Sequence, residues 1–224
     1  MADHFPLRAL CLLLCLLGWP LSGAAATPQR IISLTPHLTE LLYDIGAGDR
    51  IVATDDASDF PPEVAPLPRV ANYRSINLEA LLAQKPDLVV AWRSAQSRML
   101  APVEKLGIPV FYSEPTDFAS LATEMRSLGR LLGTRQKADQ QADAYLARLD
   151  ALKQRYGKPK PVSVFYQLWY PPLTSVNDST WPGRAIRLCG GRNIMADAAS
   201  PYPQVGLEQV IKANPDLILA GSRD

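Results

Sequence analysis

Short apolar runs alternate with segments of helical periodicity over the first half of the chain. The runs at 30–34, 51–54, 88–92 and 110–112 are short and rich in strand-forming residues. Between them, at 35–45, 78–85 and 100–106, apolar residues recur at helical spacing and the segments end at Gly or Pro. Because buried parallel strands are continuous apolar runs linked by helices, residues 27–116 are predicted to form an α/β lobe.

Residues 117–157 have a different pattern. Apolar residues recur at three- and four-residue spacing from 121 to 152, with Gly133-Thr134 near the middle. This pattern predicts one or two long helices with one apolar face, broken or kinked at Gly133. A coiled coil is less favoured, because no heptad pattern persists. We expect a rigid helical connection between two α/β regions.

The second half of the chain repeats a unit of the first. Residues 77–94 (NLEALLAQKPDLVVAWRS) align without a gap with residues 206–223 (GLEQVIKANPDLILAGSR). Each unit is predicted to be a helix with an acidic first turn, a Pro-Asp turn and a buried strand, although chance similarity of one such unit is the alternative. Residues 158–224 are therefore predicted to form a second, related lobe. This lobe is expected to be incomplete, because the first continues past the equivalent strand while the sequence stops at Asp224.

The first 26 residues are typical of a cleavable secretory signal peptide. Arg8 gives a positive start, residues 10–17 are apolar, and residues 24–26 are three alanines. The apolar run is too short to span a bilayer, so an N-terminal anchor is the minor alternative. Removing the signal leaves Cys189 as the remaining cysteine, which in an exported protein indicates a reactive thiol, an intermolecular bond or a missing partner.

Composition and motifs argue against several functions. The net charge is +1, with 20% charged residues, which gives no basic field for nucleic acid. No nucleophile elbow, phosphate loop or spaced metal-ligand set is present, and the carboxylates form no evident acid–base pair. His37 is the one histidine outside the predicted signal peptide. A lone histidine near a helix start is more often a cap or a surface residue than a ligand. The chain is therefore not predicted to be an enzyme, although an α/β enzyme with an unrecognised site is the alternative.

Aromatic residues give a stronger signal. Trp92 ends a predicted strand. Other rings lie at predicted strand ends or in proline-rich loops: Phe60, Tyr73, Trp169, Tyr170, Trp181 and Tyr202. Because ligands bind beyond the carboxyl ends of parallel strands, the set predicts an aromatic cleft for a large, flat, partly apolar ligand. For any single ring, a role in closing the edge of a lobe's core is equally favoured.

Glu79 and Glu208 occupy equivalent places in the repeated units. A carboxylate in the first turn of a helix stabilises the helix dipole, and this role needs no partner. Related lobes would also present the two as a matched pair, able to dock on arginines of a two-subunit partner.

Several segments resemble the class III substrate-binding proteins of ABC importers, and within that class those that bind vitamin B12. The resemblance covers the chain from about Arg30 onward and is carried by the following segments: ISLTPHLTELLYDIGAGDRIVATDDASDFPPE, VANYRSINLEALLAQKPDLVVAWR, LGIPVFY, PPLTS, RLCGGRNI and PYPQVGLEQVIKANPDLIL. It implies two Rossmann-like lobes with parallel sheets joined by a long helix, the second lobe truncated, and a location in the periplasm.

The resemblance also implies roles for individual residues. Trp92 matches a tryptophan of the ligand cleft in that family, and Tyr73 and Tyr202 occupy the positions of two other cleft tryptophans. Leu173 occupies the position of a cleft phenylalanine. Ala57 occupies the position of a tyrosine that contacts the ligand. Glu79 and Glu208 match glutamates that engage permease arginines, and Cys189 matches a cysteine whose partner lies in a C-terminal segment of the family. The implied ligand is cobalamin and the implied partner an ABC permease dimer, with the binding protein a monomer and no enzyme cofactor. Haem or an iron-siderophore is the alternative ligand on the same fold.

Overall fold

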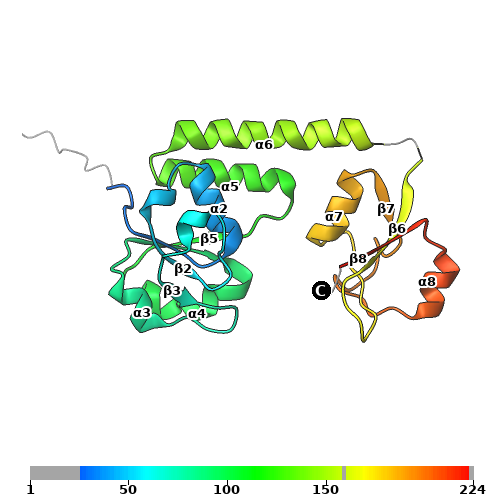
Figure 1. Cartoon of the computed structure of the whole chain (residues 1–224), viewed down its shortest axis with the longest axis horizontal. Coiled ribbons are helices and arrows are strands. Elements are labelled where there is room, and N and C mark those ends of the chain that lie inside the picture. The colour runs from blue at the N-terminus through cyan, green and yellow to red at the C-terminus, as the bar shows by residue number, and fades with distance from the viewer. Residues whose placement is uncertain (1–25, 158–159, 222–224) are drawn as a thin grey trace, which may run out of the picture.

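The computed structural model describes residues 26–157 and 160–221. Two β-sheets lie at opposite ends of the molecule, and a long helix runs along one side from the first sheet region to the second (Figure 1). The predicted signal peptide lies outside the described residues except for its last residue, Ala26. Within them, no helix is both long and apolar enough to cross a membrane.

The first sheet has five parallel strands. In chain order they are β1 (Ile31–Ser33), β2 (Ile51–Asp55), β3 (Arg69–Ala71), β4 (Leu88–Trp92) and β5 (Val110–Ser113), and their order across the sheet is β3-β2-β1-β4-β5. The sequence pattern predicted four of them. It missed β3, because three residues that begin with an exposed arginine form no apolar run.

Helices cover both faces of this sheet. On one side lie α2 (Pro36–Asp44), α5 (Phe118–Leu131) and α6 (Arg135–Tyr156), and on the other α3 (Leu78–Ala83) and α4 (Arg93–Lys105). Two short 3₁₀ turns, η1 (Gly48–Arg50) and η2 (Pro62–Val64), connect the strands β1, β2 and β3. The predicted α/β lobe is therefore a three-layer α/β/α sandwich.

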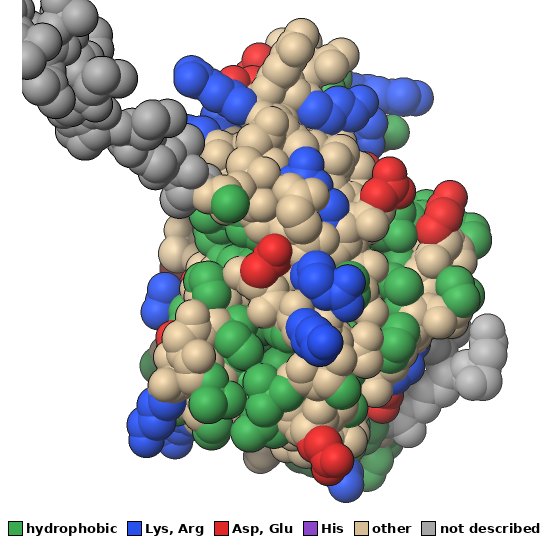
Figure 2. All heavy atoms as spheres, turned by 90° about the vertical axis from the view of Figure 1, so that its left-hand side faces the viewer, with side chains coloured by type: hydrophobic (Ala, Val, Ile, Leu, Met, Phe, Trp, Pro, Cys, Tyr) green, Lys and Arg blue, Asp and Glu red, His purple; other side chains and the backbone are tan. Residues whose placement is uncertain are grey.

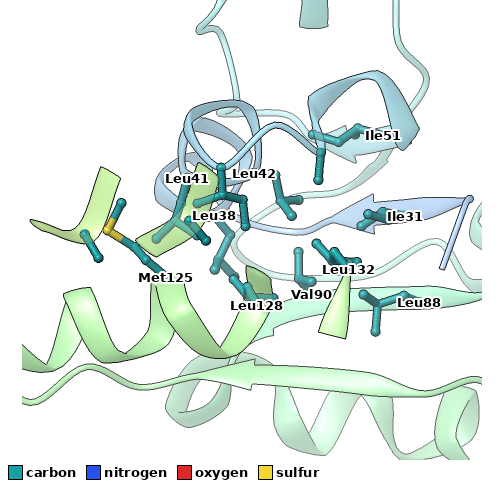
Figure 3. Packing of buried hydrophobic residues seen from close by; sticks show 14 of the residues in the cluster. Ile31, Leu38, Leu41, Leu42, Ile51, Leu88, Val90, Met125, Leu128 and Leu132 are labelled. Atoms are coloured by element: carbon teal, nitrogen blue, oxygen red, sulfur yellow. The ribbon is translucent and has the colours of Figure 1, made fainter. Parts of the chain in front are cut away.

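Two hydrophobic cores result from the alternation of side chains along the strands. Ile31 packs with α2, α5 and α6, whereas its neighbour Ile32 packs with α3 and α4. Val90 and Val89 divide in the same way. Figure 3 shows the first core, where leucines of α2 and α5 meet β1 and β4. These central strands are apolar on both faces, which explains why they appear in the sequence as unbroken apolar runs.

The helical connection consists of two packed helices, α5 and α6. Gly133 ends α5 with a φ of +68°, a conformation that glycine adopts at little cost, so the predicted break is confirmed. Beside it, Gly129 lies against Ala138: a Cβ atom on Gly129 would approach the Ala138 Cβ to 2.2 Å. The small residues thus let the two helices pack closely, and the 22-residue α6 continues on to the second lobe (Figure 1).

The second lobe contains a three-stranded parallel sheet. Its strands are β6 (Val162–Gln167), β7 (Gly191–Asn193) and β8 (Leu217–Ala220), in the order β7-β6-β8, with α7 (Trp181–Leu188) and α8 (Leu207–Ala213) between them in sequence. Its core is small and centres on Phe165, Val205 and Val210. The structure thus confirms an α/β arrangement with parallel sheets.

The repeated unit of the sequence is also repeated in three dimensions. Lys85 and Asn214 end α3 and α8, and both are left-handed, with φ of 49° and 43°. After them, Asp87 accepts hydrogen bonds from the backbone N–H groups of Gln29 and Arg30, and Asp216 accepts two from Ser163. Each Pro-Asp turn therefore ties a strand to the start of its neighbour in the sheet.

One expectation about the repeat is wrong: β8 is not buried. Leu217, Ile218 and Leu219 are 44%, 57% and 38% exposed, whereas Leu88 in the equivalent strand β4 is 1% exposed. The reason is position in the sheet. β4 lies between β1 and β5 under helices on both faces, while β8 is an edge strand with no further strand beyond it in the described part of the chain.

Charged side chains of both signs are scattered over the end of the first lobe that faces away from the second (Figure 2). No single-sign field dominates this face, which agrees with the net charge of +1.

Candidate functional site

The first sheet has one topological switch point, between β1 and β4. From β1 the chain proceeds outward to β2 and β3, and from β4 it proceeds outward the other way to β5. The loops leaving two such strands diverge and open a crevice at their carboxyl ends, where ligands bind in open α/β sheets. Pro36 and His37 follow β1, and Trp92 ends β4, so these residues meet at the crevice.

Two cavities flank Trp92 at this point. One, of about 670 Å³, is also lined by Ala57, Tyr73 and residues of the loops after β1, β2 and β3. The other, of about 730 Å³, is lined by residues of α2, α5 and α6 and by Trp181, which begins α7 of the second lobe. Pro36 and Trp92 line both. Each cavity has the volume of a ligand pocket, roughly 300–1,000 Å³, and the indole lies between them.

The His37 ring contacts the Trp92 ring directly. The ring centroids are 5.0 Å apart and the planes are inclined by 75°, a T-shaped arrangement. On its other side, His37 Nε2 is 3.4 Å from the Ser113 hydroxyl, which donates a 2.6 Å hydrogen bond to Glu124. Because the Ser113 proton is engaged with a carboxylate, its oxygen is the acceptor and His37 Nε2 is the donor. Burial lowers the pKa of His37, and the nearby Asp55 carboxylate opposes this only in part.

The backbone of Trp92 is held separately by Gln96. The Gln96 side-chain oxygen accepts from the Trp92 N–H at 2.8 Å, and its amide nitrogen donates to the carbonyl of Leu34, also at 2.8 Å. Gln96 is 5% exposed, so this bridge between the ends of β1 and β4 is buried. Gln96 therefore connects the two chain segments that leave the sheet at the switch point.

A buried polar network fixes the loop after β2. Thr39 on α2 donates to Ser33 at 2.9 Å and lies 2.9 Å from the hydroxyl of Ser58, which in turn donates to Asp55. The other oxygen of Asp55 accepts from the backbone N–H of Ala57 at 3.2 Å. These bonds set the position of Ala57 in the cavity wall.

The structure brings together only part of the predicted aromatic set. Tyr73 shares a cavity with Trp92 but is 83% exposed, and the guanidinium of Arg74 lies 5.0 Å from its ring centroid. Phe60 is 59% exposed and lines neither of the two cavities beside Trp92.

The predicted residues of the second lobe lie on two adjacent segments beyond the carboxyl end of β6. Leu173 is half-buried against the small core, and its carbonyl accepts from Val205 N–H at 2.9 Å, next to the loop that carries Tyr202. Tyr170 and Tyr202 are each 59% exposed. These three side chains are absent from the walls of both cavities beside Trp92.

Glu79 and Glu208 are exposed in the first turns of α3 and α8. The Asn77 side chain caps α3 through the N–H of Ala80, and the Gln209 side chain accepts from Gly206 N–H at the start of α8. Both helices lie in the lower half of the molecule as drawn in Figure 1, away from α6. Cys189, at the end of α7, is exposed as a free thiol.

Sequence reasoning missed two residues at the crevice, His37 and Phe118, whereas Trp181 belonged to the predicted aromatic set. His37 was interpreted as a cap or surface residue, yet it is half-buried against Trp92. Phe118 and Trp181 make a second T-shaped pair, with centroids 5.1 Å apart, that joins α5 to α7. Phe118 carried no signal beyond its place at a helix start, because only the fold brings α5 and α7 together.

Among residues 26–157 and 160–221, no cluster of three or more His, Cys, Asp or Glu side chains could hold a metal ion. The crevice instead combines aromatic walls with a few polar groups, an arrangement suited to binding a ligand by shape and stacking.

Comparisons with known proteins agree with this description. The model of the family described as periplasmic binding protein matches residues 31–224. The vitamin B12-binding protein of Vibrio campbellii is 38% identical over 215 residues, covering 96% of this chain and 78% of the relative.

Solved structures give the same result. The periplasmic vitamin B12 binding protein BtuF of Vibrio cholerae superposes with a TM-score of 0.78 at 37% identity, covering 88% of this chain and 77% of that one. The periplasmic haem binding protein HutB of Vibrio cholerae has a TM-score of 0.79 at 25% identity, with 88% and 77% coverage. These relatives are binding proteins rather than enzymes. Because the family model matches residues 31–224 and a relative is 38% identical over most of its length, this chain belongs to the periplasmic binding protein family.

Proposed function

We propose that this chain captures vitamin B12 in the periplasm and delivers it to the permease of an ABC importer. The observation that carries the proposal is the position of Trp92, between two cavities at the switch point of the first sheet. The 38% identity to vitamin B12-binding proteins supports the choice of ligand. Capture requires no chemical step, because the ligand is bound and released unchanged.

The cavities favour a large, flat ligand that packs against the Trp92 ring. Together they offer apolar walls on both sides of the Trp92 indole. Tyr73 lines the smaller cavity, and the Phe118–Trp181 pair lines the larger one. A corrin ring presents extended faces and edges to such surfaces. Leu173 and Tyr202, on the paired segments of the second lobe, are proposed to contact the ligand from the opposite side, together with Phe60 and Tyr170 at the rims.

Haem is the competing ligand on this fold, and the comparisons support it less well, because the haem binding protein HutB is 25% identical to this chain and the vitamin B12-binding protein 38%. A haem protein supplies an axial ligand such as histidine or tyrosine. In this chain His37 Nε2 is directed to Ser113 and the ring packs on Trp92, which leaves Nδ1 as the ring nitrogen that could bind iron. Tyr73 and Tyr145 are further candidates, each in the wall of one cavity, and Tyr73 makes a cation–π contact with Arg74.

For delivery, we propose that Glu79 and Glu208 dock on arginines of the permease. Each carboxylate is exposed at the start of a helix, in equivalent positions of the repeated unit. Arginine–carboxylate pairs are directional and often bidentate, so one glutamate per lobe could set the orientation of the loaded protein. Export would depend on the signal peptide proposed for residues 1–26, and sequencing of the N-terminus of the periplasmic protein tests the cleavage site.

Calorimetric titration of the purified protein with cyanocobalamin, haemin and a ferric siderophore tests the choice of ligand. We expect saturable binding of cyanocobalamin alone. Trp92→Ala is expected to weaken it by about 10- to 100-fold, as for loss of a buried aromatic anchor. Tyr156→Ala serves as the control, because this partly exposed ring lies at the end of α6 and outside both cavities. Tighter binding of haemin than of cyanocobalamin would overturn the ligand assignment.

A further inference from the structure

We infer that His37 is a positioning residue that holds the Trp92 indole in its ligand-binding orientation. The inference rests on the proposed function for its consequence, but its structural basis is independent of any ligand. A half-buried tryptophan at a strand end, such as Trp92, can adopt several staggered rotamers. If the ligand binds only one rotamer, the apparent affinity falls with the fraction of protein in the other rotamers.

Two residues hold Trp92, and only one of them acts on its ring. Gln96 fixes the backbone through the Trp92 N–H, but a backbone hydrogen bond leaves the side-chain torsions free. The ring itself is contacted by His37 at 5.0 Å in a T-shaped arrangement, which selects one orientation of the indole. The two residues therefore act on different parts of Trp92.

His37 is in turn held in place by a chain of hydrogen bonds. Its Nε2 donates to Ser113, at a long 3.4 Å, and Ser113 donates to Glu124 at 2.6 Å. Glu124 also accepts from the backbone N–H of Glu114 at 2.8 Å. Ser113 is fully buried and lies on β5, while Glu124 belongs to α5. The imidazole is thus anchored to the rigid sheet and helix rather than to a loop.

The arrangement implies that His37 affects ligand binding through Trp92. His37 lines the larger cavity, but its donor nitrogen is directed away to Ser113. Removing the imidazole would free the indole to adopt other rotamers, so that part of the population would no longer present the binding surface. Affinity would fall by the fraction of protein with the correct rotamer.

Acrylamide quenching of Trp92 fluorescence tests the inference without ligand. Subtracting the signal of Trp92→Phe, made in the same background, isolates this indole from the other tryptophans. We expect His37→Ala and His37→Asn to raise the quenching constant clearly above that of the wild type. His37→Phe should stay near the wild-type value, because a ring of similar size packs at the same place. Equal quenching in the Phe and Asn variants would overturn the inference.

A double-mutant cycle tests the effect on ligand. His37→Ala is expected to weaken cyanocobalamin binding by about 2- to 10-fold, the measured range for loss of an aromatic pair. In the Trp92→Ala background the same substitution should have no further effect. An undiminished effect there would show that His37 contacts the ligand itself and would overturn the inference. If the wild type binds no cyanocobalamin, the proposed function fails, and the quenching experiment still decides the role of His37.

Discussion

Asp216 and Ser163 are joined by three hydrogen bonds across 53 residues of sequence. The Asp216 carboxylate accepts from the backbone N–H and the hydroxyl of Ser163 at 2.8 and 2.7 Å, and the Asp216 N–H donates to the same hydroxyl oxygen at 2.9 Å. This contact ties the start of β8 to the start of β6. Since β8 has exposed apolar side chains on a small sheet, the contact is a main attachment of the last strand.

Asp216→Asn is expected to loosen the second lobe in a pH-dependent way. The hydrogen bonds from the Ser163 hydroxyl and backbone lower the pKa of Asp216 below its usual 3.8. A lowered carboxyl pKa stabilises the fold above about pH 3.8 and loses that effect as the pH falls through the folded-state value. Hydrogen exchange of the β6 amides should therefore be faster in the variant at pH 7.

The matched control is Asp197→Asn, because this aspartate is exposed. It should exchange like the wild type at both neutral and acidic pH. Exchange in β6 that is unchanged by Asp216→Asn at pH 7 would contradict the role given to this carboxylate.

Gly129→Ala is expected to destabilise the α5–α6 pair. The added Cβ would come within 2.2 Å of the Ala138 Cβ, so the helices must separate or tilt. Overpacking of this kind costs about 1–3 kcal/mol of unfolding free energy. Urea denaturation measures the loss, and the double variant Gly129→Ala with Ala138→Gly should recover most of it. A wild-type midpoint for the single variant would show that close approach at this position is not needed.

The double variant Glu79→Gln with Glu208→Gln is expected to weaken permease association and leave ligand affinity unchanged. Both carboxylates are exposed and lie outside the cavities beside Trp92. Loss of charged partners at a docking surface typically lowers the association rate and its salt dependence. Binding of the loaded protein to permease in nanodiscs, followed at two salt concentrations, provides the measurement.

Glu63→Gln with Glu104→Gln is the matched control for this experiment, since both are exposed glutamates and the change in net charge is the same. We expect this control to associate as the wild type does. Equal weakening in the two double variants would point to net charge rather than to docking by particular residues.

The free energy of unfolding is expected to decrease as the pH falls below about 6.5. We expect protonation of His37 to cause part of this decrease. Burial lowers the pKa of His37 in the folded state below its ordinary value of 6.5, so the unfolded chain binds more protons between the two values. Unfolding free energy therefore falls as the pH drops through that window. His37→Phe, which cannot be protonated, should show a smaller change in urea midpoint between pH 7 and pH 5. Parallel curves for the two proteins would contradict a buried, neutral imidazole.

Most secondary structure of the first lobe follows from local sequence. Strands apolar on both faces, such as β4, and helices ended by Gly or Pro have strong local signals, and the predicted break at Gly133 is found. β3 is too short for such a signal. The repeat also correctly indicates a second α/β unit, because the Pro-Asp turn has the same structural role in both lobes.

Local patterns did not decide which residues share the site. Trp92 was expected at the crevice from its place at a strand end, and Tyr73 joins it through the loop after β3. His37 and Ser113 are 76 residues apart, and their contact depends on the packing of α2 and β5 around the switch point. Glu124 completes that chain from α5.

The sequence alone determined the strand–helix alternation, the duplicated unit and the exclusion of evident catalytic motifs, because these depend on residue types at short, regular spacing. Tertiary structure decided that β8 is exposed and that His37 contacts Trp92. Burial depends on what covers a strand, and a contact between distant residues depends on strand order. Neither property is present in the local periodicity of the chain, since both arise from how separate elements pack.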